Sequence, residues 1–336
     1  MTLKEFLDEW NDGRPTLLVH TSGSTGEPKP MWVEKTKMLN SARITCDFLG
    51  LKGNDTALLC MPLDYIAGKM VVVRAIERHL RLIDVKPCGH PLADGVYPIG
   101  EPMPVFAAMV PLQVYNTLQV PRERERLRAI RHLIIGGGAV DGEMQEALHD
   151  FPGHIWSSYA MTETLSHIAL RQVNGPEATE WYTPFDTVAV SQAEDGCLII
   201  DAPLVHDGIL KTNDVVEMRQ RTVGGQHITQ FRVIGRKDNV IDTGGIKVHI
   251  EEIEKALAPH IRQPFAITKT PDRKFGEVVV MVSETGDTLS LRAACEQYLP
   301  KYWRPRHYVH IAHIPMTETG KIRRKALEDM ISALKL

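Results

Sequence analysis

The sequence lacks the features that mark secreted, membrane-spanning and zinc-thiolate proteins. Its five cysteines lie far apart, and no two of them form a C-x-x-C pair. This spacing argues against a disulfide framework and against a zinc site built from thiolates. No apolar run approaches the roughly 18 residues that cross a bilayer, and the first ten residues lack the basic start and apolar centre of a signal peptide. We therefore expect a cytoplasmic protein with reduced thiols and no membrane partner.

Excess charge of either sign is also missing. The 39 basic and 42 acidic side chains give a net charge of −3, so no overall positive field attracts nucleic acid or anionic lipid. Residues 122–128 alternate arginine with glutamate, which is typical of a solvated helix. The composition, 43% apolar and 24% charged, is that of an ordinary globular protein. We expect no nucleic-acid partner.

Strand and helix patterns alternate in the first part of the chain. Apolar, β-prone runs are separated by segments of helical periodicity, which favours a layered α/β sheet. The expected strands are 55–61, 82–85, 105–109 and 132–135, and the expected helices are 68–80, 122–131 and one that begins near 141. Short strands divided by turns follow over 188–234, and a compact mixed segment comes after them. We predict an α/β protein with a large layered domain over 1–235 and a small α+β domain over 236–336.

A loop rich in glycine and hydroxyl side chains follows the apolar run 16–19. Its residues are Thr21, Ser22, Gly23, Ser24, Thr25, Gly26, Glu27, Pro28 and Lys29. Such a loop can wrap a polyphosphate, because glycine lets backbone N–H groups converge on anionic oxygens and the lysine adds a positive charge. The spacing is not that of a Walker A loop. An exposed turn is the alternative, but the composition is more particular than a turn requires.

The loop resembles the T-S-G-[ST]-T-G-x-P-K signature of the adenylate-forming superfamily, which includes acyl-CoA synthetases, nonribosomal peptide adenylation domains and luciferases. Five further segments resemble motifs of this superfamily in the same order. They are 134–140 (the glycine motif beside adenine), 159–163 (Y-G-x-T-E), 211–214 (Y-x-T-G-D), 235–238 (G-R-x-D) and 315–321 (P-x-T-x-[ST]-G-K). Six ordered matches over most of the chain are hard to obtain by chance.

The resemblance implies that the chain uses ATP and Mg²⁺ to turn a carboxylic acid into an acyl-adenylate, and then passes the acyl group to a thiol, usually that of coenzyme A. Charge builds on the leaving pyrophosphate in the first step, so positioning and cations dominate catalysis. By the resemblance, Lys321 supplies the main cation, Thr162 contacts the α-phosphate and Glu163 holds Mg²⁺. The alternatives are a solvated Lys321 in a basic stretch and a Glu163 that stabilises a helix start.

Further contacts follow from the same resemblance. The residues implied in ATP binding are Thr21, Ser22, Gly23, Ser24, Thr25, Gly26, Lys29, Gly137, Gly138, Ala139, Tyr159, Asp214 and Arg236. Among them, Tyr159 would face adenine, and Asp214 and Arg236 would address the ribose hydroxyls. Asp238 would be the hinge about which a mobile C-terminal domain rotates between the two half-reactions. That rotation would bring the Gly244-Gly245 turn to the pantetheine of coenzyme A, although a plain hairpin turn is equally compatible with these glycines.

The sequence departs from the superfamily pattern at its start and at three internal positions. The phosphate loop normally lies much farther into the chain, so the first N-terminal subdomain is expected to be largely missing. One face of the cleft would then be open, or covered by a second subunit in a homodimer. Pro30, Asn213 and Tyr65 replace residues that are usual in the family. Tyr65 stands where related ligases often carry histidine in P-L-F-H-x-x-G, which puts the gating role of that histidine in doubt.

Two segments, 61–70 and 159–168, are similar to those of the o-succinylbenzoyl-CoA synthetases of menaquinone biosynthesis. Their substrate carries a second carboxylate, which needs a cation away from the ATP. Arg74 is the first candidate and Lys69 the second, and Tyr65 and Ser166 are expected to line the acyl pocket.

Alternatives remain for Arg74 and for the function. Arg74 shares a helical face with Glu77, Arg78 and Arg81, as a solvated stripe would. The chain could also load another acid onto coenzyme A or a carrier protein, or be a degenerate nucleotide-binding module. We expect o-succinylbenzoate, ATP and coenzyme A as its small-molecule partners.

Overall fold

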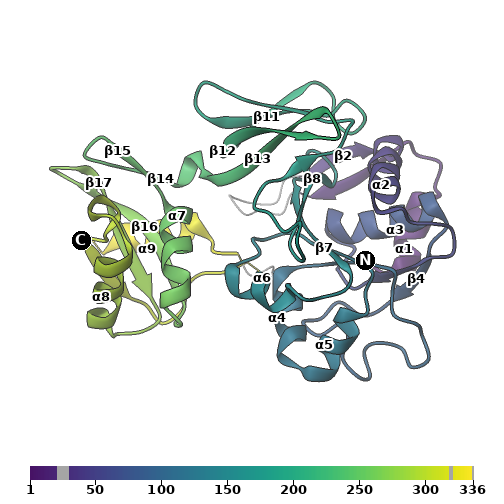
Figure 1. The fold of residues 1–336 in the computed structure, drawn as a ribbon, viewed down its shortest axis with the longest axis horizontal. Coiled ribbons are helices and arrows are strands. Elements are labelled where there is room, and N and C mark those ends of the chain that lie inside the picture. The colour runs from purple at the N-terminus through teal and green to yellow at the C-terminus, as the bar shows by residue number, and fades with distance from the viewer. Residues whose placement is uncertain (21–29, 318–320, 335–336) are drawn as a thin grey trace.

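The computed structural model describes residues 1–20, 30–317 and 321–334. Figure 1 shows them in two bodies, with the C-terminal body on the left. The N-terminal body contains the elements from α1 to β13, and the C-terminal body contains those from β14 to α9. Within the described ranges, no helix is both long enough and apolar enough to span a bilayer.

A seven-stranded sheet forms the centre of the N-terminal body. Its strands lie in the order β4-β3-β5-β6-β7-β8-β9, and the first five are parallel while β8 and β9 are antiparallel. The strands are β3 (Thr56–Leu59), β4 (Arg81–Asp84), β5 (Phe106–Met109), β6 (His132–Ile135), β7 (His154–Ala160), β8 (His167–Gln172) and β9 (Thr183–Pro184). Every residue of β3 and of β6 is buried, as expected for strands with both faces covered.

Helices cover both faces of this sheet. They are α2 (Lys35–Leu49), α3 (Ile66–Arg78), α4 (Pro111–Gln119), α5 (Pro121–Arg128) and α6 (Gly142–Leu148). The strand order reverses between β3 and β5, and crossover connections are right-handed, so α3 lies on one face and α4 to α6 lie on the other (Figure 1). The sequence analysis missed α2 and α4. Helix α2 buries Met38, Ala42, Cys46 and Leu49. These residues have the spacing of one helical face, but polar residues interrupt the apolar pattern in the sequence.

A helix and a hairpin precede this sheet. Helix α1 (Leu3–Trp10) begins with a capping box, in which Thr2 and Glu5 satisfy each other's backbone N–H groups. Strands β1 (Thr16–His20) and β2 (Pro30–Glu34) pair antiparallel, and their Leu17, Val19 and Val33 join the core of the N-terminal body. The predicted phosphate loop, residues 21–29, connects these strands and lies outside the described residues.

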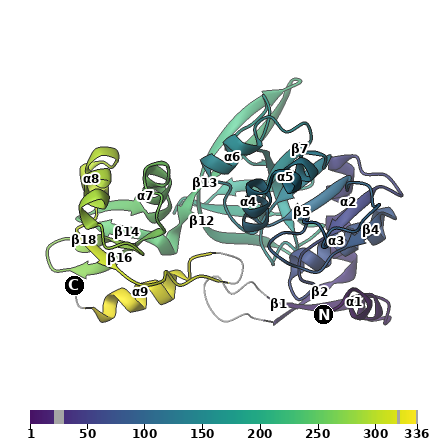
Figure 2. The same ribbon diagram turned by 90° about the horizontal axis from the view of Figure 1, so that it is seen from below.

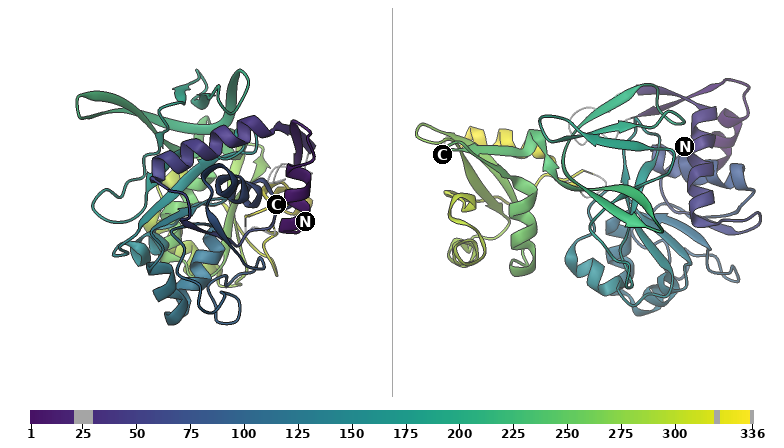
Figure 3. Two further views of the ribbon diagram at one scale, coloured as in Figure 1. Left: turned by 90° about the vertical axis from the view of Figure 1, so that its right-hand side faces the viewer. Right: turned by 45° about the horizontal axis from the view of Figure 1, so that its top comes forward.

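The strand-rich segment forms a separate four-stranded antiparallel sheet. Its strands are β10 (Ala189–Gln192), β11 (Cys197–Asp201), β12 (Ile209–Val223) and β13 (Gln226–Arg236). The last two of the short strands expected within 188–234 are therefore parts of one long hairpin, which turns at Gly224 and Gly225, both with positive φ. Figure 3 shows this ribbon extending beyond the seven-stranded sheet. Its base leads through the 3-10 turn η1 (Lys237–Asn239) into the C-terminal body.

The C-terminal body is a five-stranded sheet with helices on both faces. Its elements are β14 (Val240–Thr243), β15 (Ile246–His249), α7 (Ile250–Leu257), η2 (Ala258–His260), β16 (Phe265–Asp272), β17 (Gly276–Ser283), α8 (Thr288–Tyr298), η3 (Lys301–Trp303), β18 (His307–His310) and α9 (Arg324–Ala333). Alternate residues of β17 face opposite sides. Val279 and Met281 pack in the core with α7 and α8, whereas Val280 and Val282 pack in the core with α9.

The predicted α/β class is confirmed by these sheets. The predicted division after residue 235 remains a prediction. The hydrophobic clusters of buried residues lie within 6–231 and within 241–331, respectively, so no cluster of the described residues crosses the predicted boundary.

Gly153, between α6 and β7, is expected to be required for stability. A Cβ atom at this position would lie 2.1 Å from the carbonyl oxygen of Ile130, and this backbone contact cannot be relieved by a side-chain rotation. Gly153→Ala should therefore lower the free energy of unfolding by roughly 1–3 kcal/mol, as overpacking does, in a denaturant titration. Gly142→Ala is the matched control, because a Cβ there meets nothing within 4 Å. Equal stability of the two variants would contradict the prediction.

Candidate nucleotide and acyl site

Two of the predicted motifs lie side by side at the carboxyl ends of neighbouring parallel strands. Gly137 and Gly138 follow β6, and Tyr159 lies at the end of β7; the register pairs Ile135 with Ser157. Ligands of open α/β sheets bind at such strand ends. Directly after β6, the backbone lies close to the Ser158 side chain of β7, since a Cβ on Gly136 would lie 2.7 Å from the Ser158 hydroxyl oxygen. The glycines thus leave an accessible backbone edge at this end of the sheet.

Tyr159, Asp214 and Arg236 form one hydrogen-bonded group. The Tyr159 hydroxyl donates to Asp214 Oδ2 at 2.6 Å, and Arg236 Nη1 lies 3.4 Å from Asp214 Oδ1. The register of β12 and β13 pairs Asp214 directly with Arg236. Burial, followed by the adjacent Asp214 carboxylate, raises the pKa of Tyr159. The Tyr159 ring is 8% exposed and packs edge-on against Phe231 at 5.0 Å, so the ring has little free area for stacking on adenine.

Lys321, in the segment before α9 of the C-terminal body, is under the electrostatic influence of this group. Thr317 N–H donates to the Lys321 carbonyl at 2.7 Å, and Lys321 N–H donates to the Thr317 hydroxyl at 3.0 Å. In Figure 2 the yellow segment before α9 extends from the C-terminal body toward the N-terminal body. Burial, followed by the charge of Arg236, lowers the pKa of Lys321, and the charge of Asp214 opposes this shift. The alternative of a fully solvated lysine is therefore wrong.

Thr162 and Glu163 lie in the turn between β7 and β8. Thr162 is buried and Glu163 is exposed, and the Glu163 carbonyl oxygen is 3.1 Å from His206 Nδ1. No helix begins at this turn, so the alternative of a helix-stabilising Glu163 is wrong. The described residues contain no cluster of three or more His, Cys, Asp or Glu side chains that could hold a metal. A single exposed carboxylate fits Mg²⁺, which usually binds through one or two carboxylates, water and substrate phosphates.

The hinge candidate Asp238 is hydrogen-bonded to the last two strands of the N-terminal body, β12 and β13. Its Oδ2 atom accepts from Arg236 Nη2 at 2.9 Å and from Asn213 Nδ2 at 3.3 Å. Asn213, which replaces the usual glycine, thus holds the hinge segment against β12. Gly244 and Gly245 form the turn between β14 and β15 with φ of 63° and 81°. The two glycines therefore form a hairpin turn, as the second interpretation of the sequence predicted.

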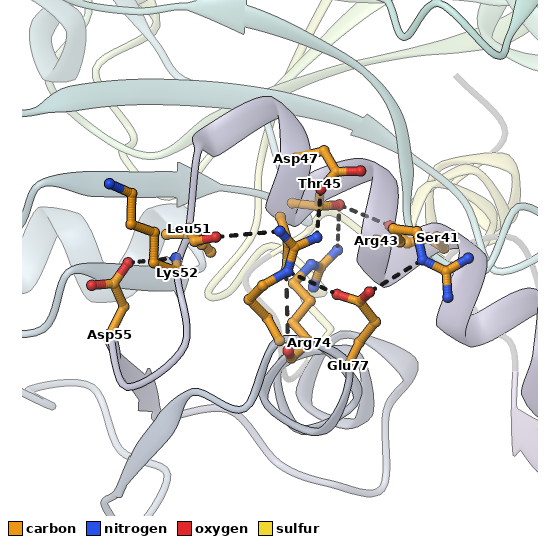
Figure 4. A network of polar contacts seen from close by, with 11 residues as sticks. Ser41, Arg43, Thr45, Asp47, Leu51, Lys52, Asp55, Arg74 and Glu77 are labelled. Carbon is orange, nitrogen blue, oxygen red and sulfur yellow. Dashed lines mark hydrogen bonds and ion pairs between the residues drawn. The ribbon is translucent and has the colours of Figure 1, made fainter.

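Arg74 is buried, and the alternative of a solvated stripe is wrong for it. Only 2% of Arg74 is exposed, and α3 buries every residue from Gly68 to Ala75. Its Nη2 atom donates to Ser166 Oγ at 2.7 Å and to Thr45 Oγ1 at 3.3 Å. Figure 4 shows Arg74 and Thr45 between α3 and α2, with Glu77 reaching outward to Arg43.

The buried guanidinium has no anionic partner in the part of the chain that the structure describes. No ion pair joins Arg74 to a described carboxylate, and its Nε atom is buried without a hydrogen-bond partner. Burial lowers the pKa of Arg74 to about 10, so the group stays charged at neutral pH. The neighbouring His167 contacts the same two hydroxyls through its ring nitrogens. Its Nε2 atom lies 3.0 Å from Thr45 Oγ1, and its Nδ1 atom lies 3.3 Å from Ser166 Oγ. Burial and the Arg74 charge hold the pKa of His167 far below its usual value.

This arrangement can bind an anion. A buried charge is costly when it is unpaired, and here the surrounding polar groups are two hydroxyls and a neutral imidazole. Sequence reasoning missed Thr45, because α2 was not predicted.

The other acyl-site candidates lie near the start of α3. Lys69 is 2% exposed, with its ammonium 3.4 Å from Met1 Sδ and 5.3 Å from the centre of the Phe6 ring. Burial lowers its pKa. Tyr65 is the partly buried residue before α3. Lys69 therefore lies under α1, whereas Arg74 and Ser166 contact each other at the buried end of β8.

Comparison with known proteins identifies relatives over nearly the whole chain. The family model described as AMP-binding enzyme matches residues 5–194. A 2-succinylbenzoate–CoA ligase of Listeria monocytogenes is 24% identical, with 97% of this chain and 72% of that protein covered. The corresponding ligase of Escherichia coli is 25% identical, with 96% and 70% covered.

Solved structures are also similar. An acyl-CoA synthetase (AMP-forming)/AMP-acid ligase II-like protein from Dyadobacter fermentans is 32% identical with a TM-score of 0.63, and 98% of this chain and 93% of that chain are covered. The o-succinylbenzoate CoA synthetase of Bacillus subtilis, in complex with an acyl-adenylate intermediate, is 20% identical with a TM-score of 0.76, and 93% and 68% are covered. The protein described here therefore belongs to the family of AMP-binding enzymes, which confirms the resemblance to adenylate-forming enzymes seen in its sequence.

Proposed function

We propose that the protein is an AMP-forming acyl-CoA ligase that activates a carboxylic acid with ATP and transfers the acyl group to coenzyme A. The observation that carries this proposal is the hydrogen-bonded group of Tyr159, Asp214 and Arg236, toward which the segment that carries Lys321 extends from the C-terminal body (Figure 2). A cation brought to a predicted nucleotide site by a separate body is the arrangement that a two-step adenylate-forming reaction requires.

In the first half-reaction, a carboxylate oxygen attacks the α-phosphorus of ATP and pyrophosphate leaves. Asp214 and Arg236 would position the ribose, Thr162 the α-phosphate and the segment 21–29 the outer phosphates. The Lys321 ammonium would stabilise the negative charge that develops between the α-phosphate and the leaving group. Glu163 would hold Mg²⁺, whose charge neutralises phosphate oxygens when it is bound.

In the second half-reaction, the thiol sulfur of coenzyme A attacks the acyl carbonyl and AMP leaves. We propose that the C-terminal body rotates about Asp238 and exchanges Lys321 for the Gly244-Gly245 turn. The short 3-10 turn at residues 237–239 is a suitable place for such a rotation, because hinges are few residues that absorb a change in φ and ψ.

For the acid, we propose o-succinylbenzoate, in which one carboxylate is activated and the other binds Arg74. The unpaired buried guanidinium supports an acid with a second anionic group. Relatives from two bacteria carry the name 2-succinylbenzoate–CoA ligase, and this name agrees with the chemistry of the Arg74 site.

A pyrophosphate-exchange screen over a panel of carboxylic acids tests the proposal. We expect exchange that depends on ATP, Mg²⁺ and o-succinylbenzoate, and that is weak with monocarboxylates of similar size. Addition of coenzyme A should then give AMP and a thioester in equal amounts. Nucleotide binding without exchange for any acid would contradict the ligase proposal, and exchange with an unrelated acid alone would contradict only the assigned substrate.

A further inference from the structure

Two of the charged residues of helix α7, Glu251 and Lys255, make contacts at the border between the two bodies. Glu251 and Lys255 are four residues apart, so they lie on the same side of the helix. The opposite side, with Ile250, Ile253 and Leu257, packs in the core of the C-terminal body. The charged side is therefore available for contacts with the N-terminal body.

Lys255 makes an ion pair across the border. Its Nζ atom lies 2.5 Å from Glu180 Oε1, and Glu180 belongs to the segment between β8 and β9 of the N-terminal body. The other carboxylate oxygen of Glu180 is 3.4 Å from Arg232 Nη1 of β13. The hydrogen bond from Lys255 is the main cause that lowers the pKa of Glu180. This pair ties α7 directly to the N-terminal body.

Glu251 fixes the other end of the same helix face. Its Oε1 atom accepts from Asn239 Nδ2 in η1, and a Cβ on Gly235 of β13 would lie 2.5 Å from its Oε2 atom. The start of α7 is thus packed against the end of β13. In this pose of the C-terminal body, the segment before α9 that carries Lys321 extends toward the N-terminal body (Figure 2), and the charges of Arg236 and Asp214 act on the pKa of Lys321.

We infer that Glu180 and Lys255 are positioning residues for adenylate formation: their ion pair holds the C-terminal body in the pose that brings Lys321 to the nucleotide site. The inference rests on the proposed two-step function. Neither side chain contacts the nucleotide group, so both act through Lys321. Rotation about Asp238 would separate α7 from the segment that carries Glu180, and the pair would then be broken during thioester formation.

Loss of the ion pair between Glu180 and Lys255 should change the ratio of the rates of the two half-reactions. If each rate is proportional to the population of its pose, the ratio of adenylation to thioester formation changes by the same factor as the ratio of the two poses. An exposed ion pair contributes modestly and is screened by salt. Loss of the pair should therefore lower the ratio by about 2- to 5-fold, and should remove part of its salt dependence.

The test compares the two half-reactions in a set of variants. Pyrophosphate exchange reports adenylation, and release of AMP from supplied acyl-adenylate plus coenzyme A reports thioester formation. Lys255→Ala and Glu180→Gln should each lower the ratio of these rates, and the double variant should lower it no further. Lys255→Arg keeps the charge and should retain the wild-type ratio. Lys325→Ala is the matched control, because Lys325 pairs with Asp329 within α9.

The outcomes separate the inference from the proposed function. Wild-type protein that catalyses neither half-reaction would contradict the ligase proposal itself. Active wild-type protein with an unchanged ratio in Lys255→Ala and Glu180→Gln would overturn the inference alone. Equal loss of both rates, accompanied by a lower melting temperature, would assign the pair a purely structural role and would also overturn it. A ratio that is less salt-sensitive in Lys255→Ala than in the wild type would support it.

Discussion

Lys321→Ala should reduce pyrophosphate exchange by about 100-fold or more, while thioester formation from supplied acyl-adenylate stays nearly unchanged. Removal of a single preorganised group that stabilises transition-state charge typically costs about 10²–10³ in rate. The segment that carries Lys321 extends toward the N-terminal body (Figure 2), and the charges of Arg236 and Asp214 act on the pKa of Lys321, so in this pose we expect its ammonium near the proposed nucleotide. The second half-reaction uses the rotated pose, in which Lys321 has left the site.

The measurement needs a control for loss of charge from the same part of the chain. Lys325 lies four residues later, is exposed and pairs with Asp329, so Lys325→Ala should leave both rates near the wild-type values. The prediction would be refuted if Lys321→Ala slowed both half-reactions equally. A normal exchange rate in this variant would also refute the assignment of Lys321 as the main cation.

The proximity of two nucleotide-site candidates is explained by their place directly after strands, although β7 was not among the strands predicted from the sequence. Parallel strands bring their carboxyl ends to the same edge, so the glycines after β6 and the Thr162-Glu163 pair after β7 had to lie close together. The pairing of Asp214 with Arg236 could not be predicted. It depends on the register of a long hairpin that turns at Gly224 and Gly225, and the sequence showed only two short strands.

The burial of Arg74 could not be predicted either. The periodicity of Met70, Val73 and Ile76 predicted the helix correctly, but it suggested an opposite, solvated face. A helix that packs between a sheet and another helix is buried nearly all round, and α2 covers α3 in this way. Because polar side chains interrupt the apolar pattern of α2, this helix could not be predicted, and the partner Thr45 was missed with it.

Loss of the Arg74 charge should weaken binding of a dicarboxylate far more than binding of ATP. A hydrogen bond to a charged group contributes about 1.5–3 kcal/mol, so Arg74→Met should raise the KM for o-succinylbenzoate by about 10- to 150-fold. The KM for ATP should stay within about 2-fold, because Arg74 contacts Thr45 and Ser166 and none of the nucleotide candidates. Arg78→Met is the matched control, since Arg78 follows on the same helix and pairs with Asp47.

A second measurement separates a ligand-binding arginine from a structural one. An analogue of o-succinylbenzoate that lacks the second carboxylate should bind the wild type and Arg74→Met equally well, because neither complex contains the proposed ion pair. The free variant should also unfold at a denaturant concentration close to that of the wild type, since replacing an unpaired buried charge with an apolar side chain removes a desolvation cost. Equal weakening of both acids, or a large loss of stability in the free protein, would show that Arg74 supports the fold rather than the substrate. A selective loss for the dicarboxylate would assign the buried guanidinium to the second carboxylate, because only that group distinguishes the two acids.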